Sequence, residues 1–127
     1  MKSKILAALS VGLGLLMVSG PVFAHHSANG YDRQHLVTLA GTVTEYKFTN
    51  PNVEIRFEVK DENGNVEEWT AESGPPNRLF RAGWSKESLK PGDQIKVTGN
   101  PLKDGRKIMS VVKVVAPGGQ ELSEGAD

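Results

Sequence analysis

Apolar and polar residues alternate along most of the chain after residue 36, and a period of two is typical of β-strands with one buried face. The clearest run covers residues 53–60, where every second residue is large and apolar and the residues between are charged. A hairpin turn is predicted at residues 61–64, whose sequence is Asp-Glu-Asn-Gly. Further strands are expected at residues 37–48, 66–73, 95–99 and 108–115.

The first expected strand contains a change of phase. Leu39, Gly41 and Val43 occupy one set of alternate positions, whereas Tyr46 and Phe48 occupy the other. A slip of one residue in a period of two indicates a β-bulge, and a glycine within a strand indicates a tight bend. We therefore expect this strand to curve strongly.

A short helix is expected between the third and fourth strands, over Arg78–Ala82. Asn77 is the expected N-cap and Gly83 the expected C′ residue. Leu79 and Phe80 are its expected contacts with the core.

Three strands, a helical link and two strands follow one another over residues 37–115. This order predicts an all-β domain, a small five-stranded OB-like Greek-key barrel with a short helix between strands 3 and 4. Closure into a barrel also removes the exposed edges of a small sheet. A small open sandwich and an SH3-like barrel are the alternatives.

Residues 1–24 have the pattern of a secretory signal peptide. Lys2 and Lys4 precede an apolar run over residues 5–18, and small residues flank a cleavage site after Ala24. The run is shorter than the 20 or so residues of a membrane span. We therefore expect a periplasmic protein that is not inserted in the membrane after cleavage.

Cleavage there leaves 103 of the 127 residues, with 13 basic and 15 acidic side chains and a net charge of −2. This balance gives no electrostatic reason to expect nucleic acid as a partner. The chain has no cysteine, which excludes disulfides, thiolate metal sites and a thiol nucleophile. We expect residues 25–36 to form an N-terminal arm and residues 116–127 to be a disordered tail, because the tail is rich in glycine and acidic residues.

The first candidate site is the new N-terminus, which begins His25-His26. A free α-amine and an imidazole both lose protons near neutral pH, and nitrogen ligands in a tetragonal plane suit Cu(II). His35 is the remaining histidine and a candidate third ligand, while Asp32 and Glu45 are possible oxygen ligands. The alternative is that two terminal histidines bind metal weakly without a physiological role.

A second candidate is a partner or anion site formed by Arg78, Arg81 and Trp84, because residues three apart are neighbours on a helix. The favoured interpretation is structural. Leu79, Phe80 and Trp84 would then plug one end of the barrel, and the two arginines would be solvated.

A third candidate is the exposed sheet face that carries Arg56, Glu58, Thr70 and Glu72. Its mixed charges and lack of an aromatic platform do not suit single-stranded nucleic acid. The sequence also lacks the spacing of a nucleophile elbow, a phosphate-binding loop or a zinc-protease helix. We therefore expect no enzyme activity.

Several motifs resemble a bacterial family of small exported proteins that carry a domain of unknown function. They are His25-His26-Ser27, Thr49-Asn50-Pro51, Gly83-Trp84 and Lys90-Pro91-Gly92-Asp93. The resemblance implies a periplasmic OB-like barrel without an assigned activity. In that family a histidine commonly follows the Asn-Pro pair, whereas this chain has Asn52, so a metal ligand there is not carried over.

These observations together predict a periplasmic, non-catalytic binding module whose ligand or partner protein is unknown. A periplasmic copper-binding protein that uses the mature N-terminal histidines is the first alternative. An accessory subunit of an envelope complex is the second. Copper is the one cofactor for which the residues give a reason.

Overall fold

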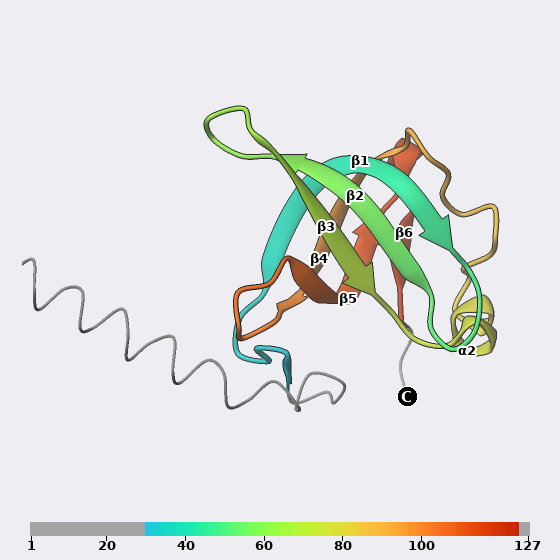
Figure 1. Ribbon diagram of the computed structural model, residues 1–127. Helices are drawn as coiled ribbons and strands as arrows, with labels where there is room; N and C mark the ends of the chain where they lie inside the picture. Colours follow the sequence, from blue (N-terminus) through green and yellow to red (C-terminus); the bar gives the residue numbers. More distant parts are fainter. Residues whose placement is uncertain (1–29, 125–127) are drawn as a thin grey trace, which may run out of the picture. The chain divides into compact units, whose positions relative to one another are not determined.

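The computed structural model describes residues 30–124 (Figure 1). The expected signal peptide, His25 and His26 lie outside the described residues. The strands are β1 (Val37–Lys47), β2 (Glu54–Lys60), β3 (Val66–Glu72), β4 (Gln94–Pro101), β5 (Ile108–Val115) and β6 (Glu121–Ser123). The helix α2 (Pro76–Arg81) lies between β3 and β4, and a 3-10 turn, η3 (Pro117–Gly119), precedes β6.

The strands form one sheet in the order β3-β2-β1-β4-β5-β6, and neighbours in this order are antiparallel. A parallel pairing of β3 with β5, over Thr70–Glu72 and Ile108–Ser110, closes the first five strands into a barrel. Figure 1 shows the curved strands wrapping around one interior. The OB-like barrel with one short helix between its third and fourth strands is thus confirmed.

The interior is filled by the apolar residues that the alternation identifies. Ile55 and Phe57 of β2 are completely buried, as is Val53 just before the strand, and the charged residues between them face outward. β1 has the expected irregularity, because its register with β2 shifts between Val43 and Glu45. The bulge lets this long strand curve enough to pair with β2 on one side and with β4 on the other.

Gly41 fills a position that has no room for a side chain. A Cβ atom there would lie 2.4 Å from the backbone oxygen of Glu58. The bend predicted at Gly41 therefore rests on the close approach of β1 to β2.

The helix differs from its prediction in its start and in one core contact. It begins at Pro76, so Asn77 lies inside it, and the N-cap is Pro75 without a capping side chain. Gly83 has a φ of 102° and follows the helix as expected. Leu79 is completely buried, whereas Phe80 is 66% exposed. Adjacent residues point about 100° apart around a helix, and α2 turns Leu79 toward the core and Phe80 toward solvent.

The C-terminal segment corrects the prediction of a disordered tail over residues 116–127. Residues 116–124 are ordered, and β6 pairs with β5 over three residues, from Lys113–Ser123 to Val115–Glu121. Leu122 anchors this segment, because its side chain is 2% exposed and belongs to the core. This otherwise polar stretch is thus held by one buried leucine, three strand pairs and the hydrogen bonds that Ser123 and Glu124 accept from Trp84, Ser73 and Arg78. Residues 125–127 lie outside the description.

Candidate functional site

The arm that leads into β1 is fixed to the barrel by backbone contacts. Tyr31 forms a β-bridge with Leu102, and the N–H of Asp32 donates to the carbonyl of Pro101 over 2.7 Å. The side-chain amide of Asn100, at the end of β4, donates to the carbonyls of Asp32 (3.1 Å) and His35 (2.7 Å). Asn100 is the one buried polar side chain among the described residues, and it satisfies two carbonyls of the turn.

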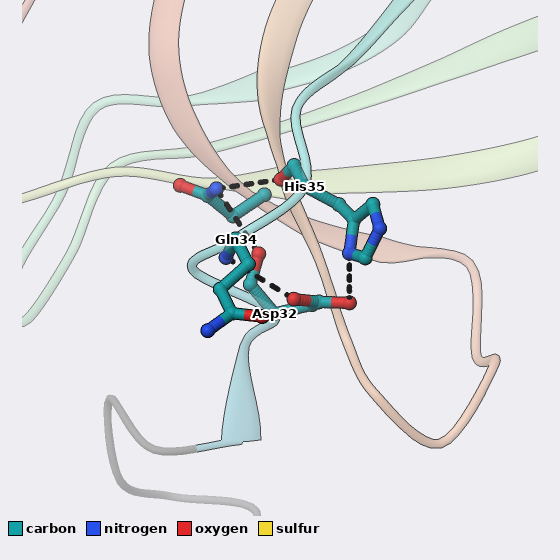
Figure 2. Close-up of polar contacts among 4 residues, drawn as sticks. Asp32, Gln34 and His35 are labelled. Carbon is teal, nitrogen blue, oxygen red and sulfur yellow. Dashed lines mark hydrogen bonds and ion pairs between the residues drawn. The ribbon is translucent and has the colours of Figure 1, made fainter.

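Within this turn Asp32 and His35 form a pair (Figure 2). The Nδ1 atom of His35 lies 2.7 Å from Oδ2 of Asp32, and the N–H of Gln34 donates to Oδ1 over 3.1 Å. Desolvation raises the pKa of Asp32, but the hydrogen bonds from His35 and Gln34 outweigh it, so the pKa lies below its ordinary value. Because this carboxylate is ionised near neutral pH, Nδ1 carries the proton and donates it. Nε2 of the neutral ring then keeps its lone pair.

The imidazole of His35 is also accessible, since its side chain is 71% exposed. A histidine whose one ring nitrogen donates to a carboxylate has its tautomer and orientation set by that bond. The arm therefore holds an imidazole on the surface, with Nε2 available to a ligand.

Tyr31 attaches the same arm to β3. Its hydroxyl donates to the carboxylate of Glu72, and the guanidinium carbon of Arg33 lies 5.6 Å from the centre of its ring. Burial raises the pKa of Tyr31 far above its ordinary value, and the hydrogen bond to Glu72 and the negative charge there act in the same direction. The phenol therefore stays neutral over the physiological range.

An alkaline titration tests this environment, because the chain has only two tyrosines. Burial also raises the pKa of Tyr46 to about 12, the charge of Glu87 adds to this rise, and a hydrogen bond with Ser88 opposes it. In the folded protein, phenolate absorbance should stay low as the pH passes 10, whereas the unfolded protein should titrate near 10. Both pKa values are raised by folding, so this contribution to stability is complete below pH 10 and is lost from there toward 12. A full phenolate signal near pH 10 in the folded protein would contradict it.

The other predicted residues are not brought to this corner. Glu45, on β1, forms ion pairs with Arg56 (3.6 Å) and Lys47 (3.9 Å). No cluster of three or more His, Cys, Asp or Glu residues suited to a metal occurs within residues 30–124. Of the predicted metal ligands, the described part of the chain therefore contributes His35, held by Asp32 as its partner.

The structure does not assemble Arg78, Arg81 and Trp84 into an open site. Trp84 is 1% exposed, and its indole N–H donates to the carbonyl of Ser123 over 2.7 Å. Arg78 donates to the carboxylate of Glu124 over 3.1 Å, whereas Arg81 is exposed. Leu79 and Trp84 thus belong to the core, as the structural interpretation expected.

Sequence reasoning missed Asn100 and the pair Tyr31–Glu72. Asn100 stands at the end of an alternating run, where a polar residue is unremarkable, and Tyr31 and Glu72 are 41 residues apart. The pair of Asp32 and His35 has a local signal, because the two residues are three apart in a polar stretch without strand periodicity.

Fold and arm together define a small OB-type barrel with an N-terminal arm that presents a histidine. The chain belongs to a family of unknown function, DUF6152, whose pattern matches residues 12–110. No curated protein gives a match to the chain. Among the residues that the structure describes, no helix has the length and hydropathy needed to cross a membrane.

Three of the solved structures with a similar fold have the following low identities to this chain. Yeast Stn1 and Ten1 match with 13% identity and a TM-score of 0.42, over 64% of this chain and 42% of that one. TiaS in complex with a tRNA and ATP matches with 21% identity and a TM-score of 0.44, over 67% and 18%. The N-terminal domain of PriB from Thermoanaerobacter tencongensis matches with 20% identity and a TM-score of 0.46, over 66% and 97%. Such likeness concerns the fold and carries no argument about a ligand.

Proposed function

We propose that this protein is an exported, non-catalytic binding module that works in the periplasm and holds its ligand at the corner between the N-terminal arm and the barrel. The observation that carries the proposal is the fixed presentation of His35. Asn100 donates to the carbonyls of Asp32 and His35, and the ring of His35 is bonded to the carboxylate of Asp32. The His35 side chain that these bonds hold remains 71% exposed. An exposed polar side chain with such support is organised for binding rather than for folding alone.

Cu(II) is the ligand that the chemistry of this corner favours. Imidazole suits copper, and the affinity of nitrogen sites for divalent metals is highest for Cu(II). A carboxylate that accepts a hydrogen bond from the second ring nitrogen is the usual outer partner of a ligating histidine, and Asp32 has this relation to His35.

The remaining ligands would come from the mature N-terminus. Export with cleavage after Ala24 would create an α-amine on His25 and place His26 next to it. His26 and His35 are nine residues apart in the sequence, and a chain spans at most about 3.5 Å per residue, so the connecting segment permits a wide range of separations. We propose that the amine, His25 and His35 hold the metal, with His26 as the further nitrogen donor.

The test is a calorimetric titration with Cu(II) of the mature protein and of a version with one extra alanine before His25. The extension converts the amine of His25 into an amide, so affinity should fall by at least about tenfold. His35→Ala should have an effect of similar size. Asp32→Asn, which keeps the shape but removes the charge, should weaken binding by about tenfold.

Gln34→Ala is the matched control, because this side chain lies in the same turn and only its backbone N–H is used. Its affinity should equal that of the mature protein. Electron paramagnetic resonance should show nitrogen ligands in the mature protein and fewer of them after His35→Ala. Equal copper affinity in the mature and the extended protein would exclude the copper site and leave a binding module with another ligand.

A further inference from the structure

A shallow groove crosses the outside of the barrel on the face of β1. It consists of two hollows of about 350 Å³ each, which share Ala40 and Gln94. The first is completed by Gly41, Thr42, Glu58, Lys60 and Val66, and the second by Ile95, Lys96, Val115 and Ala116. Each hollow is within the size range of small-molecule sites.

The strand register explains why these residues lie in one row around the outer wall of the barrel. Val66 pairs with Lys60 across β3 and β2, Ala40 pairs with Lys96 across β1 and β4, and Lys96 pairs with Val115 across β4 and β5. The β1–β2 register pairs Thr42 with Glu58, and its continuation by two residues brings Ala40 toward Lys60. With about 4.8 Å between strands, this row covers about 19 Å along the curved outer wall of the barrel, since the five strands are those that close it.

The row has the same types of residue on both sides of Ala40. Ala40 forms the low point at the centre, a lysine stands on either side of it, and a valine ends the row at each side. Ala40 is exposed and small, so the groove has its thinnest side-chain cover where the two lysines flank it. The backbones of Lys60 and Lys96 are two strand spacings apart, or about 10 Å, and both long side chains can therefore reach a group that lies on Ala40.

The charge of this groove is not balanced within the described residues. Neither Lys60 nor Lys96 forms an ion pair with any of residues 30–124, although Glu58 lines the first hollow. The side-chain amide of Gln94 donates to the hydroxyl of Thr42 over 2.8 Å. These two neutral polar side chains of the groove are therefore bonded to each other. An anion on Ala40 would meet two ammonium groups that have no ion-pair partner in this part of the chain.

The second hollow adds an apolar requirement. Four of its six lining residues, Ala40, Ile95, Val115 and Ala116, are aliphatic, although Ile95 and Ala116 are themselves buried in the core, and Lys96 is its one charged residue. A ligand that fits both hollows therefore has a compact acidic group and an aliphatic body.

We infer that this groove binds an anionic amphiphile, with its carboxylate or phosphate between Lys60 and Lys96 and its aliphatic chain along Val115 and Ala116. The site uses none of the residues of the arm and does not depend on copper binding. The groove recognises the charge and the shape of its ligand, and no chemical step takes place.

The experiment follows amide chemical shifts of the full mature protein as four probes are added below any micelle concentration: decanoate, decyl phosphate, decanol and inorganic phosphate. Decanoate and decyl phosphate should shift Ala40, Gln94 and Val115 in a saturable way, and the tighter of the two identifies the acidic group. Decanol and inorganic phosphate should bind at least about tenfold more weakly, since each lacks one half of the ligand.

Variants separate the lysines from the floor of the groove. Lys60→Gln and Lys96→Gln should each weaken binding by up to about fivefold, the upper range for one exposed ion pair. Ala40→Phe fills the centre and should abolish binding, while its exposed position on a strand lets the barrel fold. Lys86→Gln, an exposed lysine outside the groove, is the control and should change nothing.

Equal binding of decanol and decanoate would overturn the inference, as would equal binding of phosphate and decyl phosphate. Unchanged binding in Ala40→Phe would place the probe elsewhere and would also overturn it. Absence of saturable shifts with all four probes would have the same consequence. None of these outcomes changes the expected copper titration, because the arm and the groove share no residue.

Discussion

Trp84→Ala should lower the free energy of unfolding by about 3–5 kcal/mol, the usual cost of truncating a large buried aromatic side chain. Trp84 is the largest of the fully buried side chains, and its indole N–H donates to the carbonyl of Ser123. The change would leave a cavity and also leave that carbonyl without its donor. Urea unfolding followed by circular dichroism measures the loss.

Phe80→Ala is the matched control, because it truncates an aromatic residue four positions away. Phe80 is 66% exposed, so its removal should change the free energy of unfolding by less than about 0.5 kcal/mol. A large loss with Phe80→Ala and a small one with Trp84→Ala would contradict the orientation of α2 described above. Equal losses would do so as well.

Leu122→Ala should cost about 2–5 kcal/mol, as expected for a leucine truncated in a core. The residue lies in β6, in a segment whose sequence suggests disorder, yet it packs with the barrel core. Its loss should also weaken the pairing of β6 with β5, because the three residue pairs and the hydrogen bonds to Ser123 and Glu124 then act without a buried apolar anchor. Hydrogen exchange of the β6 amides and of Val115 reports this weakening separately from global unfolding.

Leu36→Ala provides the comparison, since Leu36 is 62% exposed and precedes β1. It should be nearly neutral in the same unfolding measurement. If Leu122→Ala were equally neutral, the C-terminal segment would be a weakly attached tail and the sequence-based expectation of disorder would stand.

The strands of the barrel could be predicted because the alternation of apolar and polar residues is visible within a few consecutive residues and recurs from strand to strand. The alternation over residues 53–60 identifies the buried face of β2 directly, and the phase change in β1 identifies its bulge. The order of the elements predicts the barrel type, but the pairing of β3 with β5 could not be predicted, because parallel partners about 38 residues apart leave no local signal. β6 escaped prediction because three residues with one apolar side chain are below the length at which periodicity is visible.

The candidate site also contains residues that the sequence identifies locally and residues that it does not. His35 was identified because histidine is rare in this chain, and its partner Asp32 lies three residues before it. Asn100 is 65 residues from His35, and its two donated bonds depend on how the end of β4 meets the arm. Phe80 was predicted to contact the core because it is apolar and adjacent to Leu79. In the structure α2 packs one face against the core, and Phe80 lies on the other.

The arm and the C-terminal segment are held at neighbouring positions of the same strand end. Tyr31 donates to Glu72, and the hydroxyl of the next residue, Ser73, donates to the carboxylate of Glu124 over 2.6 Å. Both ends of the described chain are thus tied by hydrogen bonds to adjacent residues at the end of β3. In a circular permutant that is opened in the exposed turn between β2 and β3, with a linker from Glu124 to Tyr31, these two contacts should therefore still hold both segments to β3.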